Sequence, residues 1–248
     1  MDRLIYTAMA AMNAAIDRQR VVANNLANAL TPGFRQEVFA VTPATLKDGS
    51  LEARAMARGN VRGPDMKAAR VVPTGNPLDV ALEGKALIAY QSPDRQGEVY
   101  SRRGDLRIGA SGVLENGEGL VVLGERGTPI TVPSGFSISL ATDGAVFASD
   151  PAAPNASAEA VDRIRLVNPE GSPLAKGIDG FLKVPNGGVL PPDLTARLIP
   201  GGLENSNVET ADTLVQMIEA QRAFEQRARV IATAGELDEV SGGLMALR

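Results

Sequence analysis

The chain has 248 residues, of which 44% are hydrophobic and 22% charged, and its net charge at pH 7 is −4. This balance is typical of a folded chain with room for one large domain or two to three smaller ones, and the absence of a basic run argues against nucleic acid as a partner. The sequence contains no histidine, cysteine or tryptophan, which excludes thiolate nucleophiles, histidine-based triads and zinc sites built from cysteine or histidine.

An amphipathic helix is predicted from about Leu4 to Leu30. On a helical wheel of roughly 100° per residue, apolar residues recur at three- and four-residue spacing around Leu26. This side carries Leu4, Ile5, Ala8, Met12, Ala15, Gln19, Val22, Ala23 and Leu30, with Met9 and Ile16 just beyond it. Pro32 and Gly33 predict that the helix ends near Leu30. The segment lacks a basic start followed by a continuous apolar core, so we expect neither a cleaved signal peptide nor a membrane span.

Polar residues gather on the opposite side of this helix. They are Asn13, Asp17, Asn24 and Asn28, with Val21 near the same side and Asn25 beside them in the sequence. A carboxamide donates and accepts hydrogen bonds without carrying charge, so it can be satisfied between closely packed helices. We therefore predict a second packing surface at Val21, Asn24, Asn25 and Asn28, whereas for Asn13 and Asp17 a solvated face is an equally good interpretation.

The middle of the chain lacks the helical periodicity of its N-terminal segment. Residues 36–76 are punctuated by proline and glycine and are predicted to form an extended arm of low helix content. Residues 77–190 contain short apolar runs separated by turns, which predicts an all-β domain, and residues 191–205 are a return linker. The candidate strands lie in PLDVALEG, ALIAY, VYSRR, LVVLG, PITVP, FSISL, AVFA and DRIRLV, and the turns include Asn116-Gly117 and Asp143-Gly144.

A second amphipathic helix is predicted in residues 206–248, running to about Val240. The sequence SNVE fits a capping box, with Ser206 as the N-cap and Glu209 reaching back to it. The apolar stripe consists of Leu214, Met217, Gln221, Phe224, Ala228 and Ile231, flanked by Val208, Ala211, Val215 and Ile218. Gly235 would mark a bend or an early end of this helix.

These elements predict an α+β fold with several domains. They are an axial helix and turn at 1–35, the arm at 36–76, the β-rich domain at 77–190, the linker at 191–205 and a second axial helix at 206–248. The two terminal helices are expected to pair in a coiled-coil-like manner. One buried apolar stripe offsets only part of the conformational entropy lost on ordering a helix, so a pair of helices alone would be marginal and we expect it to need neighbours.

Candidate catalytic groups are few. Asp79 and Glu83 would lie about 13 Å apart on one side of a strand, too far for a glycosidase pair, so ordinary polar-face residues are the favoured interpretation. In RRGD, at 102–105, an Asp–Arg contact that stabilises a turn is favoured over ligand binding. The glycine-rich segment GASGVLENGEG lacks the phosphate-binding patterns. We predict no catalytic residue, no cofactor, no metal and no small-molecule substrate.

Four blocks of the sequence resemble the flagellar axial proteins of the rod and hook group. They are ANNLANALTPGFR, TGNPLDVALEG at 74–84, YSRRGDL at 100–106 and LENSNVETADTLVQMIEAQRAFE at 203–225. The opening MDRLIYTAM, followed by TPGFR, is most similar to the proximal-rod members of this family. The resemblance implies a non-enzymatic subunit of the basal-body rod, which crosses the periplasm.

The resemblance also implies how such a subunit works. Paired terminal helices form the inner layer of a tube that transmits torque and leaves an export channel, with the β-domain outside. The helices are disordered in the free monomer, and the protein is exported by the flagellar type III apparatus without a cleaved signal peptide. Expected partners are other rod proteins, copies of itself and, during secretion, the export apparatus, with no nucleic acid and no direct membrane insertion.

Thirteen residues are predicted to form the assembly interface. The apolar stripes of the two helices pack on each other, and the asparagines contact another subunit or the paired helix. The residues are Met9, Met12, Ile16, Val22, Asn24, Asn25, Leu26, Asn28, Leu214, Met217, Ile218, Phe224 and Ile231. Three alternatives remain open. One is the distal rod protein of the same family, a second is an envelope enzyme acting on peptidoglycan, which the missing histidine and cysteine disfavour, and a third is a secreted adhesin-like β-module with helical ends.

Overall fold

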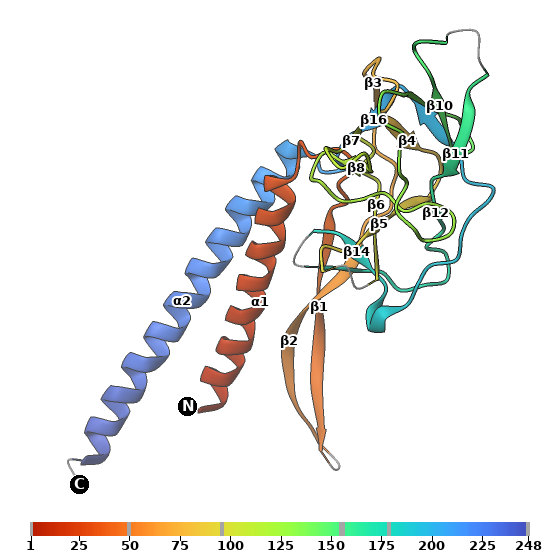
Figure 1. Cartoon of the computed structure of the whole chain (residues 1–248). Helices are drawn as coiled ribbons and strands as arrows, with labels where there is room; N and C mark the ends of the chain where they lie inside the picture. Colours follow the sequence, from red (N-terminus) through yellow and green to blue (C-terminus); the bar gives the residue numbers. More distant parts are fainter. Residues whose placement is uncertain (1, 49–50, 95–96, 154–156, 178–179, 247–248) are drawn as a thin grey trace. The chain divides into compact units, whose positions relative to one another are not determined.

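The computed structural model describes residues 2–48, 51–94, 97–153, 157–177 and 180–246 (Figure 1). The chain divides into two compact units. The first, called here the helical unit, consists of Met1–Ala27, Glu37–Gly63 and Val208–Arg248. The second, the β-rich unit, consists of Asn28–Gln36 and Pro64–Asn207. Helices at both ends of the chain and many strands between them confirm the α+β class.

The helical unit is built on α1 (Asp2–Ala27) and α2 (Thr210–Ala246), which run side by side and antiparallel in Figure 1. At about 1.5 Å per residue they are roughly 39 and 55 Å long. Helix α1 ends before the predicted Leu30 because the chain turns there: the Thr31 N–H donates to the carbonyl of Asn28 at 3.1 Å.

The start and end of α2 correct two expectations. The predicted capping box is wrong, because the Thr213 N–H donates to the Glu209 carbonyl at 2.9 Å and so makes Glu209, not Ser206, the N-cap residue. The helix also continues through Gly235 and past Val240 to Ala246. A helix-interior glycine costs only about 1 kcal/mol, so it weakens the helix without ending it.

The segment expected to be an extended arm forms a long hairpin. Strands β1 (Glu37–Asp48) and β2 (Leu51–Pro64) pair as a two-stranded sheet, a pairing that was not predicted. Gly59 lies close to α1, because a Cβ atom placed on it would lie 3.3 Å from the Cα of Ala14 and 2.8 Å from the Phe39 ring. A glycine at this position lets the hairpin approach the helix.

The β-rich unit contains a series of short strands joined in antiparallel pairs. In chain order they are β3 (Val71–Pro73), β4 (Val80–Leu82), β5 (Leu87–Gln91), β6 (Glu98–Ser101), β7 (Leu106–Ile108), β8 (Leu114–Asn116), β9 (Ser137–Leu140), β10 (Ala145–Ser149), β11 (Glu159–Arg163), β12 (Leu166–Val167), β13 (Ala175–Lys176), β14 (Leu182–Lys183), β15 (Leu198–Pro200) and β16 (Gly202–Glu204), with a 3₁₀ turn at Pro185–Gly187. The largest sheet has the order β12-β5-β6-β14-β13, a second has the order β11-β10-β9, and β15-β4, β16-β3 and β7-β8 form pairs.

Strands β5 and β6 lie between two hydrophobic cores. In β5, Ile88 and Tyr90 belong to the larger core, whereas Leu87 and Ala89 belong to the smaller one on the other face. All four side chains are fully buried. A strand buried on both faces has a continuous apolar sequence, which explains why ALIAY shows no alternation.

Several local predictions in this unit are confirmed and others are not. Asp143-Gly144 forms the turn between β9 and β10, with Gly144 at φ +85°. LVVLG and PITVP do not form regular strands: their residues make isolated bridges such as Tyr90 with Val122. PLDVALEG contains β4, as predicted, and all three residues of this strand are buried, with Val80 and Leu82 in the larger core.

Candidate assembly site

The helices of the helical unit carry large apolar side chains that the chain itself leaves exposed. The exposed fractions on α2 are 47% for Leu214, 55% for Val215 and 53% for Ile218. On α1, Met9 is 51% exposed. An apolar groove of about 220 Å³ lies between the two helices, lined by Thr7, Ala8, Ala11, Arg227 and Val230. Large exposed apolar side chains beside an apolar groove make this the candidate binding surface of the unit.

The residues predicted for the apolar interface differ in burial. Val22 is buried, Met12, Leu26, Met217, Phe224 and Ile231 are half-buried, and Met9, Ile16, Leu214 and Ile218 are exposed. The structure thus places this set on α1 and α2 but leaves a large part of it uncovered in the single chain. Its role between subunits stays a prediction.

The predicted interface asparagines have partners within the chain; Asn24 and Asn25 lie on α1, whereas Asn28 follows the end of the helix and belongs to the β-rich unit. The Asn25 side chain donates to the Glu37 carbonyl at 3.0 Å and accepts from the Glu37 N–H at 2.8 Å, while Asn24 donates to the Glu37 carboxylate at 3.3 Å. Asn28 accepts a hydrogen bond from the Thr31 hydroxyl at 3.2 Å. The second packing surface on α1 therefore includes the start of β1, and contacts with another subunit remain a prediction for these residues.

In the β-rich unit, the turn that follows α1 requires glycine at Gly33. Its φ is +67°, and a Cβ atom there would lie 2.3 Å from the carbonyl carbon of Arg102. The Gly33 N–H donates to the carbonyl of Glu204 at 2.7 Å. Three parts of the sequence that are far apart, TPGFR, RRGD and LENSN, therefore meet at one point.

A buried carboxylate joins these three parts. Glu204 accepts from the guanidinium of Arg35 at 2.6 Å, from that of Arg102 at 2.6 Å and from the Ala69 N–H at 2.9 Å. Both arginines and the glutamate are at most 2% exposed. Burial lowers the pKa of Arg35 below its usual value, and Glu204 acts in the opposite direction. A buried charge is tolerated only when it is paired in this way.

Arg102 also binds three backbone carbonyls. Its guanidinium donates to Leu82 at 2.5 Å, to Gly84 at 2.9 Å and to Ala86 at 2.7 Å. These carbonyls flank the turn between β4 and β5. One side chain thus satisfies polar backbone groups that would otherwise be buried without partners.

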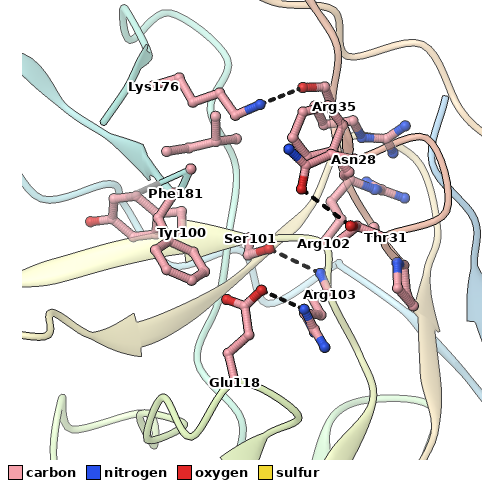
Figure 2. Close-up of a pocket in the computed structure, with 15 residues that line it drawn as sticks. Asn28, Thr31, Arg35, Tyr100, Ser101, Arg102, Arg103, Glu118, Lys176 and Phe181 are labelled. Carbon is pink, nitrogen blue, oxygen red and sulfur yellow. Dashed lines mark hydrogen bonds and ion pairs between the residues drawn. The ribbon is translucent and has the colours of Figure 1, made fainter. Parts of the chain in front are cut away.

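Figure 2 shows a small cavity beside this junction, lined by Asn28, Thr31, Arg35, Tyr100, Ser101, Arg102, Arg103, Glu118, Lys176 and Phe181 among others. Lys176 lies 3.4 Å from the centre of the Phe34 ring and donates to the Arg35 carbonyl at 3.0 Å. The cavity has a volume of about 60 Å³. Small-molecule pockets are typically about 300–1,000 Å³, so this space suits a few water molecules rather than a substrate.

The remaining polar motifs stabilise turns. Arg103 donates to Asp105 at 2.7 and 2.8 Å and to Glu118 at 2.5 Å, which confirms the predicted Asp–Arg contact in RRGD. The hydrogen bonds to Asp105 raise the pKa of Arg103. Asp79 is not on an open polar face as expected: it is 8% exposed and accepts from Thr74 at 2.6 Å and Asn76 at 2.9 Å.

Two tyrosine hydroxyls are buried in the same unit. Burial raises the pKa of Tyr100 to about 12, and the nearby carboxylate of Glu98 acts in the same direction. The Tyr100 hydroxyl donates to Glu98 at 3.1 Å and accepts from the Leu190 N–H at 2.9 Å. Burial also raises the pKa of Tyr90, whose hydroxyl donates to the Arg103 carbonyl. Both groups have structural partners.

Sequence reasoning missed the residues that meet at this junction. Glu204 and Arg35 are separated by 169 positions, and Glu204 and Arg102 by 102. The sequence did mark these residues in one respect, because all three lie in segments that resemble the flagellar axial proteins. Glu204 lies in residues 203–225, Arg102 lies in residues 100–106, and Arg35 ends ANNLANALTPGFR. Among the described residues there is also no cluster of acidic side chains arranged to hold a metal ion.

Comparison with known proteins decides the family. Residues 5–35 match the family described as "Flagella basal body rod protein", and residues 199–241 match "Flagellar basal body rod FlgEFG protein C-terminal". The flagellar basal-body rod protein FlgF of Salmonella typhimurium is 36% identical over 253 residues, with all of both chains covered. The chain belongs to the flagellar basal-body rod protein family.

Two further rod proteins sharpen this assignment. FlgF of Escherichia coli is 37% identical over 95% of both chains, whereas FlgG of Bacillus subtilis is 25% identical over 96% of this chain and 97% of its own. The chain is therefore a FlgF-like rod protein. It is a structural subunit of the flagellar basal body that assembles with other rod proteins, and its family is not a family of enzymes. In the described part of the chain, neither helix is long and apolar enough to cross a membrane.

Proposed function

We propose that this rod protein assembles through α1 and α2, in a coiled-coil-like arrangement, into a tube that transmits torque and leaves an export channel. The helices form the inner layer, and the β-rich unit is a separate outer domain. The observation that carries this proposal is the exposed apolar surface of α1 and α2.

The composition of the buried residues in the helical unit supports this role. Among the residues of this unit whose side chains the structure describes, 6–27, 37–42, 58–63 and 208–237, the buried apolar ones are small, namely Ala14, Ala15, Val21, Val22, Val208, Ala220 and Ala234. Most helical stability in proteins comes from packing of an apolar face. A unit whose described core consists of alanine and valine gains stability when neighbouring subunits cover its large exposed side chains. Many close-packed helices would also resist torque, since packed interiors are stiff.

The partners follow from the same arrangement. We propose contacts with copies of this chain and with other rod proteins, at a position in the rod that crosses the periplasm. During secretion the chain would pass through the flagellar export apparatus, without a cleaved signal peptide. Helices that order only on assembly would suit passage through a narrow channel in an unfolded state.

A proximal position in the rod is favoured over a distal one. The matches named FlgF reach 36% and 37% identity, and the FlgG of Bacillus subtilis has 25%. An enzymatic role on peptidoglycan finds no support, because Asp79, the best candidate acid, is held by two side chains of its own turn.

Matched substitutions in the two units test this function. Leu214→Ser with Ile218→Ser removes apolar surface from α2, and Leu194→Ser with Ile199→Ser makes the same change at exposed residues of the β-rich unit. In a strain lacking the native gene, we expect the first variant to abolish rod assembly and swimming and the second to retain both. Assembly of the α2 variant at the wild-type level would disprove assembly through the helices.

Stability measurements make this test specific. Exposed substitutions usually change the free energy of unfolding by less than about 0.5 kcal/mol. Both variants should therefore unfold at the wild-type denaturant concentration in the free state. A lost rod with an unchanged monomer assigns the defect to the interface.

A further inference from the structure

Asn207 is the last residue of the β-rich unit before the chain enters the helical unit. The chain passes from one unit to the other at four places: after residues 27, 36, 63 and 207. Within the β-rich unit, the residues beside three of these crossings are joined by the side chain of Asn207.

The carboxamide of Asn207 uses both of its ends. Its oxygen accepts from the Gln36 N–H at 2.7 Å, and its nitrogen donates to the Asp65 carbonyl at 2.8 Å. The backbone N–H of Asn207 also donates to the Phe34 carbonyl at 3.3 Å. Asparagine suits this position because one short side chain both accepts and donates without charge.

The two residues that the Asn207 side chain contacts, Gln36 and Asp65, are also hydrogen-bonded to each other. The Asp65 N–H donates to the Gln36 carbonyl at 2.8 Å, and the Gln36 side chain donates to the Asp65 carboxylate at 3.2 Å. Nearby, the Gly33 N–H donates to the Glu204 carbonyl at 2.7 Å. Residues 33–36, 65 and 204–207 are therefore one hydrogen-bonded group inside the β-rich unit.

We propose that Asn207 is a positioning residue for assembly, which holds the chain crossings together so that the hairpin and α2 start from one shared base. This inference rests on the proposed assembly through the helices. Gln36 and Asn207 are 171 positions apart, and bringing residues so far apart in the chain together costs entropy. Because the hydrogen bonds of Asn207 already hold them together in the free chain, this cost is not paid again on assembly. The hairpin and α2 can then bind a neighbouring subunit together rather than one at a time.

The test compares Asn207→Ala with Asn205→Ala in the full chain. Asn205 is exposed, and its backbone N–H donates to the Arg70 carbonyl at 2.9 Å, a bond that alanine retains. Hydrogen exchange of the free protein is measured at Gln36 and, as an internal reference, in β5 and β6. Swimming and rod assembly are measured in cells that lack the native gene.

We expect Asn207→Ala to speed exchange at Gln36 on the order of tenfold, the effect of losing one neutral hydrogen bond. Exchange in β5 and β6 should stay at the wild-type rate, and rod assembly should fall. Asn205→Ala should match the wild type in every measurement. Asn207→Asp retains an acceptor for Gln36 but not the donor for Asp65, so its assembly should lie between those of the wild type and Asn207→Ala.

Three results would overturn the proposal. They are unchanged exchange at Gln36 in Asn207→Ala, faster exchange with wild-type assembly, and faster exchange throughout β5 and β6, which would make Asn207 a general stabiliser. A failure of the proposed function itself looks different, because there the Leu214/Ile218 variant would assemble normally.

Discussion

The helical unit and the β-rich unit differ in what they bury. The β-rich unit contains two cores with large side chains such as Tyr90, Leu87, Ile88 and Leu114, all fully buried. In the helical unit, the buried apolar side chains that the structure describes are alanine and valine, and residues such as Leu214 and Ile218 are about half exposed. A unit that covers its own apolar surface can fold alone, whereas one that leaves it exposed depends on neighbours.

The polar groups show the same difference. In the β-rich unit, Arg35, Arg102 and Glu204 form a buried charge network with distances of 2.6 Å. In the helical unit, Arg18 and Glu219 lie 3.3 Å apart, with side chains 39% and 60% exposed. Exposed ion pairs contribute about 0–1 kcal/mol, whereas breaking a buried pair is strongly destabilising. The free chain should therefore owe its stability to the β-rich unit.

The largest effect is expected from Glu204→Gln. Glutamine leaves two buried guanidiniums without a counter-charge, so the free energy of unfolding should fall by about 3–5 kcal/mol. Denaturant unfolding followed by circular dichroism measures the loss. Glu219→Gln, its control in the helical unit, should change the value by less than about 0.5 kcal/mol. Equal effects of the two variants would contradict the contrast between the units.

The second-largest loss of stability is expected from Gly33→Ala. The new Cβ atom would lie 2.3 Å from backbone atoms of Arg102, and φ at this position is +67°. The conformation costs about 1–3 kcal/mol for a residue other than glycine, and the backbone clash adds to it. Gly84→Ala has a similar φ of +60° but no atom within 4 Å, so it isolates the conformational part. The expected result is a lower unfolding midpoint for Gly33→Ala than for Gly84→Ala.

A pair of valine substitutions compares the units directly. Val146, in the larger core of the β-rich unit, is fully buried, and Val22 of α1 is 3% exposed. Val146→Ala should lower the free energy of unfolding by about 1.5–3 kcal/mol. Val22→Ala should leave the transition of the free chain unchanged within about 0.5 kcal/mol, because the helical unit contributes little before assembly. A large effect of Val22→Ala would show that the helices are stable without neighbours.

The smallest effect concerns alkaline pH. Because the pKa of Tyr100 is raised to about 12 in the folded protein, above its usual value near 10, the folded state holds this proton more tightly. The stability from Tyr100 is fully present below pH 10 and is lost as the pH rises toward 12. Tyr100→Phe should lose less stability than the wild type over this range. Thermal melts at a series of pH values measure the difference, and identical slopes would refute the assignment.

The helices and several strands follow from local patterns. The three- and four-residue spacing of apolar residues predicted α1 and α2, and Asp143-Gly144 predicted the turn between β9 and β10. The end of α1 was displaced because Asn28 and Thr31 form a turn, and the start of α2 was displaced because Glu209 caps it. Such shifts reflect single hydrogen bonds that periodicity does not encode.

The candidate site was predicted unevenly for a related reason. The helix faces could be named from their spacing, but the partner of Asn25 is the backbone of Glu37, which depends on where β1 begins. The cluster around Glu204 and the ties of Asn207 were missed, because their partners lie more than 100 positions away. No local pattern marks which polar residue will be buried beside which other.

The sequence by itself determined that both ends are helices, that the middle is made of strands, and that the chain resembles the flagellar rod proteins. Apolar periodicity and turn residues act over a few positions, so they can be interpreted without a fold. The tertiary structure decided that Arg35, Arg102 and Glu204 share one buried site and that the Asn207 side chain bonds to Gln36 and Asp65. Burial of a polar group is tolerated only when the group has a partner, and for these residues the partners come from distant parts of the chain that only the folded structure brings together.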